Sequence, residues 1–214
     1  MEKTQNSKYN RIFLIGYMGC GKTTVGKELS KLMGYSHVDM DAEIETIEGM
    51  PVSKIFMRFG EHEFRNKEAE LLDKLCNVTS GIHLMTGGEG AVKKMLNRAS
   101  LYADFEKVGN SKDTAAVISC GGGIILDDLN CTVLKKECTV FLEGSLPLLF
   151  SRIKSDSNRP LAFMDITPEK KQFEKFSDLY STRKTAYENT ALFTLQIDGK
   201  TPEMIANEIF EKIV

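Results

Sequence analysis

Residues 11–25 read RIFLIGYMGCGKTTV, and this stretch decides the fold. Its apolar start, residues 12–15, is typical of a buried strand. A helical pattern follows over residues 23–33, with Gly34 as the expected C-cap. Between the two, residues 16–23 fit the pattern GxxxxGK[ST]. Glycines in such a turn let successive backbone N–H groups point at one anion. The stretch therefore predicts a strand, a phosphate-binding P-loop and a helix in direct succession.

The same stretch indicates what is bound. Lys22 can reach the β- and γ-phosphates of a nucleoside triphosphate, and the Thr23 hydroxyl can ligate Mg²⁺. The alternative, a glycine-rich turn beside a solvated lysine, does not explain why a strand precedes the motif and a helix follows it. We therefore expect a nucleotide site.

Length and composition are those of a globular protein and give no indication of a membrane or nucleic-acid-binding protein. A chain of 214 residues is long enough for one domain with a substantial core, and its formal charge of −2 offers no general attraction to nucleic acid. No apolar run approaches the ~20 residues that span a bilayer, and the N-terminus lacks the apolar core of a signal peptide. The five cysteines show no CxxC spacing, which favours free thiols. We expect a cytosolic, single-domain protein that binds neither membrane nor nucleic acid.

Further apolar segments predict an α/β fold. Short strands are expected at residues 35–38, 115–119, 139–142 and 193–197, with helices at 42–48, 51–59, 61–75, 147–153 and 168–188. A terminal helix should begin after Thr201 as N-cap, with Pro202 at its first position. Five apolar strands that alternate with helices predict a parallel sheet with helices on both faces.

Three segments fall outside this regular pattern. Residues 1–9 are polar and expected to fray, and residues 77–113, which several glycines interrupt, are expected to be an insertion. Residues 155–167 contain Asn158-Arg159-Pro160, which breaks the helical pattern, and we expect a mobile lid there.

Polar and glycine-rich groups directly follow three of the predicted strands. They are residues 16–23, the pair Asp39 and Asp41, and residues 121–123, which are all glycine. Ligands of such folds gather at the carboxyl ends of the strands, so these groups should share one edge of the sheet. Asp39 and Asp41 alternate, so one can face Mg²⁺ and the phosphates while the other faces a neighbouring pocket. Without a P-loop beside them, two solvated carboxylates capping the next helix would be the better interpretation.

The arginines admit two interpretations. Arg65 and Glu68 lie three residues apart on one helix face, either as an exposed ion pair or as a carboxylate-binding fork held by Glu68, and their spacing does not choose. Arg152 and Arg159 flank the predicted lid, and phosphoryl-transfer enzymes commonly close an arginine over the reacting phosphate. Arginines in loops are usually exposed to solvent, which is the alternative interpretation for these two. Arg183, on the long helix, is a similar candidate. The histidines have no spacing that indicates a triad or a metal site.

Together these residues resemble the shikimate kinase family over about 10–76 and 115–214. The matching runs occur in the family's order: GYMGCGKTTVGK at 16–27, DMDAEIE at 39–45, EGMPV at 48–52, FRNKE at 64–68, GGG at 121–123 and RPL at 159–161. The resemblance implies an ATP-dependent, Mg²⁺-requiring kinase that phosphorylates the 3-hydroxyl of shikimate, on the pathway to chorismate and aromatic amino acids. It also implies a monomer with one domain over 10–214, a P-loop kinase fold like that of nucleoside monophosphate kinases, and substrate-binding helices at about 41–76.

The resemblance also implies roles for the nucleotide half of the site. Thr23 would ligate Mg²⁺ with Asp39 assisting through water, Arg152 would stack on adenine, and Arg159 would contact the transferring phosphate. The ATP phosphates would lie on Gly19, Cys20, Gly21, Lys22, Thr23 and Thr24.

For the acceptor half, the resemblance implies that Asp41 binds the shikimate hydroxyls and is the candidate base for the 3-hydroxyl. Arg65, positioned by Glu68, and Arg183 would hold the carboxylate. Gly121, Gly122 and Gly123 would form the substrate loop, with the Gly122 backbone against the ring.

Departures from the family pattern keep alternatives open. The family places its glycine triplet closer to its Phe-Arg pair, so the run TGGE at residues 86–89 competes with residues 121–123 as the substrate loop. We prefer 121–123 because a better strand precedes it and its distance to Arg159 fits the family. Arg183 and Tyr187 match the family's Arg-x-Pro-Leu-Tyr, but the residues between them do not. Another small-molecule P-loop kinase, such as a gluconate kinase, or a non-catalytic nucleotide-binding regulator are the alternative functions.

Overall fold

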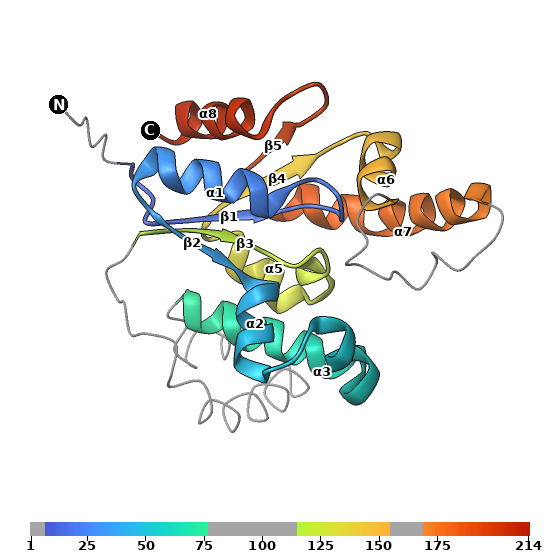
Figure 1. Ribbon diagram of the computed structural model, residues 1–214. Coiled ribbons are helices and arrows are strands. Elements are labelled where there is room, and N and C mark those ends of the chain that lie inside the picture. Colours follow the sequence, from blue (N-terminus) through green and yellow to red (C-terminus); the bar gives the residue numbers. More distant parts are fainter. Residues whose placement is uncertain (1–6, 77–114, 155–168) are drawn as a thin grey trace. The chain divides into compact units, whose positions relative to one another are not determined.

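The structure is a computed structural model that describes residues 7–76, 115–154 and 169–214 (Figure 1). It forms two compact units, one of Met1–Asp39 with Ala115–Val214 and one of Met40–Thr114. We call the described parts of these the sheet unit and the helical unit. The predictions for most of the N-terminus, the insertion at 77–113, the run at 86–89 and the lid with Arg159 lie outside the described residues. The single-domain organisation stays a prediction.

A five-stranded parallel sheet is the core of the sheet unit, as the sequence predicts. Its strands lie in the order β2-β3-β1-β4-β5, and each neighbouring pair is parallel. They are β1 (Arg11–Ile15), β2 (Ser36–Asp39), β3 (Ala116–Ser119), β4 (Cys138–Glu143) and β5 (Phe193–Gln196). The three central strands are buried at nearly every position because helices cover both faces, which explains their continuous apolar runs.

Helices cover this sheet on both faces. Figure 1 shows α1 (Lys22–Met33) and α8 (Pro202–Ile213) on one face, where they pack against each other, and α5 (Asp128–Leu134) and α7 (Glu169–Thr190) on the other. The short η3 (Ile124–Leu126) precedes α5, and α6 (Leu146–Lys154) follows β4. The predicted caps are confirmed: Gly34 ends α1 with φ 69°, and the Thr201 side chain accepts from the Met204 N–H at the start of α8.

The helical unit contains α2 (Met40–Glu48) and α3 (Val52–Leu75). The element α3 contains the two predicted helices, which meet at a kink where Gly60 has the non-helical φ 83° and ψ 168°. A positive φ of this kind suits glycine, which explains why the break between the two helices falls at this residue. At the start of α3 the Val52 N–H donates to Glu45 Oε1 at 2.8 Å, which ties the two helices together.

Two details near the predicted site correct the sequence analysis. Asp39 is the last residue of β2 rather than the first after it, because it pairs with Ser119 on β3. Asp41 is already helical, in the first turn of α2, since the chain turns from strand to helix at Met40 without a connecting loop. The two carboxylates are therefore not alternate residues of one extended segment.

The five cysteines, all in the described part of the chain, are buried and form no disulfide, as expected. In the described ranges, no helix has the length and apolar character needed to cross a membrane.

Candidate active site

The P-loop connects β1 to α1 as predicted, and two of its glycines allow close backbone contact. A Cβ on Gly16 would lie 2.6 Å from the Leu142 carbonyl oxygen, and one on Gly19 would lie 2.6 Å from that of Leu149. Gly16 and Gly19 also have φ of 149° and 83°. A side chain at either position would push the loop away from β4 and α6. The loop is therefore shaped by its packing on these two elements.

Lys22, the first residue of α1, reaches back over the loop. Its Nζ donates to the carbonyl oxygens of Gly16 at 2.8 Å and Tyr17 at 3.3 Å, and lies 3.6 Å from Cys20 Sγ. The ammonium charge is thus held beside the loop N–H groups. An anion bound by those groups at the N-terminus of α1 would meet this charge.

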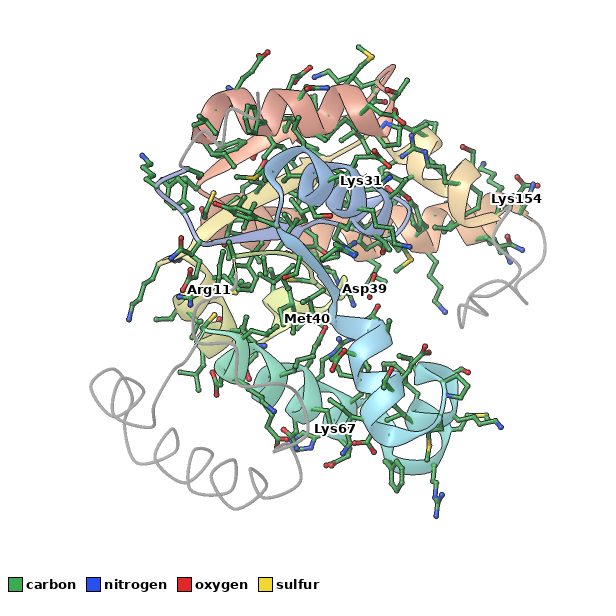
Figure 2. All side chains as sticks on the ribbon, turned by 60° about the vertical axis from the view of Figure 1, so that its left-hand side comes forward. Arg11, Lys31, Asp39, Met40, Lys67 and Lys154 are labelled. Carbon is green, nitrogen blue, oxygen red and sulfur yellow. The ribbon has the colours of Figure 1, made fainter. Side chains whose placement is uncertain are left out.

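Thr23 and Asp39 are brought together as predicted. Thr23 Oγ1 in the first turn of α1 donates to Asp39 Oδ2 at 2.5 Å, and Figure 2 shows Asp39 at the end of β2. A hydroxyl and a carboxylate oxygen beside a phosphate loop are the ligands that Mg²⁺ prefers, since it keeps several waters and takes few protein ligands. The donor set therefore fits Mg²⁺. In keeping with so few ligands, the described residues contain no cluster of three or more His, Cys, Asp or Glu suited to a metal.

Sequence reasoning missed His37, which supports the start of α1. His37 Nε2 lies 3.0 Å from Ser119 Oγ, and that hydroxyl donates to the Lys22 carbonyl oxygen at 3.0 Å. A Cβ on Gly26 would lie 2.6 Å from both side chains, so glycine is needed for them to fit. Burial lowers the pKa of His37, although the Asp39 carboxylate opposes the shift. The alternation of His37 and Asp39 on β2 was the available signal, because both point to one face.

The glycine triplet lies beside the P-loop. Gly122 belongs to the turn after β3, and a Cβ there would lie 3.7 Å from the Gly16 carbonyl oxygen and 3.8 Å from the Met18 nitrogen. Its own carbonyl oxygen accepts a hydrogen bond from Tyr187 Oη on α7. The triplet is thus at the carboxyl edge of the sheet, where the sequence places it.

Arg183 also lies on α7, one turn before Tyr187. Its Cζ is 6.0 Å from the centre of the Tyr17 ring in the P-loop. Its Nε is buried and has no hydrogen-bond partner among the residues that the structure describes. Arg183 therefore lies close to the P-loop, with a donor still available.

Arg152 on α6 lies against the P-loop from another side. Its Nη1 donates to the Gly19 carbonyl oxygen at 3.3 Å. At the start of the same helix, the Ser145 N–H and hydroxyl donate to Asp198 at 2.9 and 2.5 Å. These hydrogen bonds lower the pKa of Asp198, the Ser145 hydroxyl most of all. They attach the turn after β5, where the sequence assigned no residue, to the helix that carries Arg152.

In the helical unit, Arg65 is held by two carboxylates. Its Nη1 donates to Glu68 Oε2 at 2.6 Å and its Nη2 to Glu61 Oε1 at 3.1 Å. The Glu68 side chain is fully buried and that of Arg65 is 23% exposed, so this is not the exposed ion pair that spacing alone allowed. Burial acts to lower the pKa of Arg65, but Glu68 and Glu61 outweigh it and raise that pKa. The guanidinium stays charged and oriented. Asp41 belongs to the same unit.

Known proteins are similar to this chain over most of its length. The family model described as "Shikimate kinase" matches residues 18–108 and 105–214. The chain is 36% identical to a shikimate kinase of Thermodesulfovibrio yellowstonii, over 94% of this chain and 93% of that one. It is 31% identical to a shikimate kinase of Persephonella marina, over 94% of this chain and 98% of that one.

A solved structure is similar as well. The shikimate kinase of Acinetobacter baumannii, solved in complex with shikimate, superposes with a TM-score of 0.73 at 27% identity, covering 97% of this chain and 94% of that one. Family model, relatives and fold point to the same group of proteins. The chain therefore belongs to the shikimate kinase family of ATP-using phosphotransferases, which act on an alcohol group.

Proposed function

We propose that this protein transfers the γ-phosphoryl group of ATP to the 3-hydroxyl of shikimate. The observation that carries the proposal is the position of Gly122, whose Cβ would lie within 3.8 Å of two P-loop backbone atoms. An acceptor resting on the backbone of this turn would lie next to a phosphate bound by the P-loop. Phosphoryl transfer needs this proximity more than any covalent help from the protein.

In the proposed complex, the P-loop amides from Gly19 to Thr24 bind the ATP phosphates and Lys22 neutralises the charge that develops on them. Thr23 and Asp39 would hold Mg²⁺. When bound, this ion would neutralise part of the negative charge on the phosphate oxygens, which otherwise repels the incoming hydroxyl. Arg152 covers the adenine. Support for this arrangement comes from the 2.5 Å hydrogen bond between Thr23 and Asp39 and from the contact of Arg152 with Gly19.

The acceptor is held by groups that match its chemistry. Shikimate carries a carboxylate and hydroxyl groups, for which arginine forks and an aspartate are suitable partners. We assign the carboxylate to Arg65, held by Glu68, and to Arg183. We assign the hydroxyls to Asp41, which takes the proton of the 3-hydroxyl as it attacks. Gly121, Gly122 and Gly123 form the loop against the ring. Arg159 stays a prediction from the sequence as the arginine that contacts the transferring phosphate.

The alternative functions account for fewer of these features. A gluconate kinase shares the P-loop but has less use for two arginines that bind a carboxylate. A non-catalytic regulator does not need the set of Lys22, Asp41, Arg65 and Arg159. The monomeric state and the cytosolic location stay predictions from the sequence.

A coupled assay for ADP release tests the proposal. Shikimate, gluconate and nucleoside monophosphates are compared as acceptors, with Mg²⁺ present and after its removal by a chelator. We expect turnover with shikimate, loss of activity without Mg²⁺, and a product with phosphate on the 3-oxygen by phosphorus NMR. Absence of turnover with shikimate would overturn the proposal, and turnover with gluconate alone would establish the alternative.

A further inference from the structure

Helix α7 is joined to both loops of the sheet unit's candidate site by tyrosine hydroxyls. Tyr17 Oη in the P-loop donates to the Phe176 carbonyl oxygen on α7 at 3.1 Å. Tyr187 Oη on α7 donates in the opposite direction, to the Gly122 carbonyl oxygen in the glycine turn. Both tyrosines are fully buried. The helix is therefore attached to the phosphate loop and to the glycine turn by separate contacts.

Tyr187 has little freedom to leave this position. Its ring stacks on Phe141 of β4, with ring centres 5.0 Å apart and planes inclined by 15°. Burial raises the pKa of Tyr187 well above its ordinary value, and Arg183 opposes this only in part. The hydroxyl stays protonated and remains a donor. A packed ring with a buried donor sets the place of the carbonyl oxygen that it contacts.

Arg183 lies along this helix between Phe176, which Tyr17 contacts, and Tyr187. It is four residues before Tyr187, so both side chains leave α7 on the same side. Its guanidinium is also near the Tyr17 ring, and its Nε is buried without a hydrogen-bond partner in the described part of the chain. The arginine and the glycine turn are thus set relative to each other through one short stretch of helix.

We infer that Tyr187 is a positioning residue for the acceptor: its hydroxyl holds the Gly122 carbonyl at a set place relative to Arg183. The glycine turn and the arginine then form one preorganised surface, on which the ring and the carboxylate of a small hydroxy acid can bind together. This inference rests on the proposed function, since shikimate is the acceptor. Tyr187 itself touches neither the phosphates nor the reacting hydroxyl in this scheme.

A purely structural role for Tyr187 makes a different prediction. Loss of a buried hydroxyl would then lower stability without a preference for one substrate. Tyr180 offers a matched control, because it is buried on the same helix and its Oη donates at 3.1 Å to Glu143 rather than to the glycine turn. Glu143 keeps hydrogen bonds from Lys184 and Gln196 when that hydroxyl is removed.

The test compares Tyr187→Phe with Tyr180→Phe in the full chain. We expect Tyr187→Phe to raise the KM for shikimate, and its Kd by calorimetry, about threefold to tenfold, as loss of one hydrogen bond predicts. The KM for ATP should stay within about twofold, and Tyr180→Phe should change neither substrate's KM by more than that. Thermal unfolding of both variants shows that they are folded. Equal changes in the KM values of shikimate and ATP, or none, would overturn the inference.

Amide hydrogen exchange tests the inference without any substrate. In the ligand-free protein, a peptide covering residues 120–126 should exchange faster in Tyr187→Phe than in the wild type, while a peptide from the start of the P-loop should not. If the wild type binds no shikimate, the proposed function fails, and exchange alone decides the role of Tyr187. Faster exchange confined to residues 120–126 would still support it, and unchanged exchange would refute it.

Discussion

Thr23 Oγ1 donates a 2.5 Å hydrogen bond to the carboxylate of Asp39, which joins the first turn of α1 to the end of β2. The two residues are far apart in the sequence but meet where the parallel sheet ends and the P-loop helix begins. A hydroxyl and a carboxylate in contact at this point are oxygen ligands that suit Mg²⁺. The relationship leads to the first prediction.

Substitution of Asp39→Asn should weaken the use of Mg²⁺. The amide oxygen can still accept from Thr23, but it lacks the charge that attracts the cation or its bound water. We expect the Mg²⁺ concentration for half-maximal activity to rise about tenfold or more, as changes in partners of metal ligands commonly cause. Titration of activity with Mg²⁺ at saturating ATP and shikimate measures this. Asp178→Asn, at an exposed position on α7, is the control and should leave the titration unchanged. An unchanged titration for Asp39→Asn would remove Asp39 from the metal site.

Arg65→Lys should impair acceptor binding. Lysine keeps the charge but cannot present a planar fork to a carboxylate while also donating to Glu68. We expect the KM for shikimate to rise about tenfold to a hundredfold, the effect of losing a hydrogen bond between charged groups. Steady-state kinetics with each substrate varied in turn makes the measurement.

Arg58→Lys is the matched control for Arg65→Lys, because Arg58 is an exposed arginine on the same helix, α3. It should leave both KM values near those of the wild type. A shikimate KM that rises equally in the two variants would show that the effect comes from the helix rather than from a specific contact.

Asp41→Asn should separate binding from chemistry. Asparagine can still hydrogen-bond to shikimate hydroxyls but cannot take a proton, so we expect kcat to fall about 10²-fold to 10⁴-fold. Shikimate binding by calorimetry should change far less. Glu43→Gln, in the same first turn of α2, controls for the loss of charge there. An unchanged phosphorylation rate in Asp41→Asn would show that Asp41 is not the base, and a small loss would indicate that it only orients the hydroxyl.

Glu143 should stabilise the sheet unit in a pH-dependent way. Burial acts to raise the pKa of this carboxyl, but the Lys184 ammonium at 2.6 Å and the donors Tyr180 and Gln196 lower it below the ordinary 4.5. A carboxyl whose pKa is lower in the folded state binds protons more readily when unfolded. Its contribution is therefore complete above pH 4.5 and is lost as the pH falls through the lowered value.

Glu143→Gln tests this contribution. We expect the variant to lose about 1 kcal/mol of unfolding free energy at pH 7, because a neutral amide replaces the charged acceptor of Lys184. Urea unfolding at pH 7, pH 5 and pH 4 should show the difference from wild type shrinking only at the lowest pH. Glu188→Gln removes the other carboxylate near Lys184, 3.6 Å away and 44% exposed. It should have little effect at any pH, since exposed pairs contribute little. A difference that grew toward low pH would contradict the assignment.

Much of the fold could be predicted from the sequence because local residue patterns determine strands, turns and helix ends. Short runs of four or five residues indicated all five strands, four of them mostly apolar and the run at 35–38 only partly so. The P-loop and the caps at Gly34 and Thr201 marked helix boundaries correctly. An error arose where strand pairing decides the end of a strand. Asp39 joins β2 because Ser119 lies opposite, whereas the helix break predicted at Gly60 is present as the kink within α3.

Only part of the candidate site could be predicted from the sequence. Thr23, Asp39 and Gly122 could be assigned to one edge because each lies at or beyond the carboxyl end of a strand of a parallel sheet. The role of His37 could not be seen, because its partner Ser119 is 82 residues away and the space for both depends on Gly26. The choice between the two interpretations of Arg65 also needed the structure, since the burial of Glu68 depends on packing rather than on spacing.

The sequence by itself determined the order of strands and helices, the phosphate loop and the set of charged residues from which a site could be built. These features depend on residues that are close together in the sequence. They are the periodicity of strands and helices, glycine in a turn, and a threonine beside a lysine. Only the tertiary structure decided that Tyr187 holds Gly122, that Glu68 holds Arg65 from a buried position, and that Arg183 lies near Tyr17. Contacts such as that between Tyr187 and Gly122 form between distant parts of the chain, once packing has excluded water and oriented each donor.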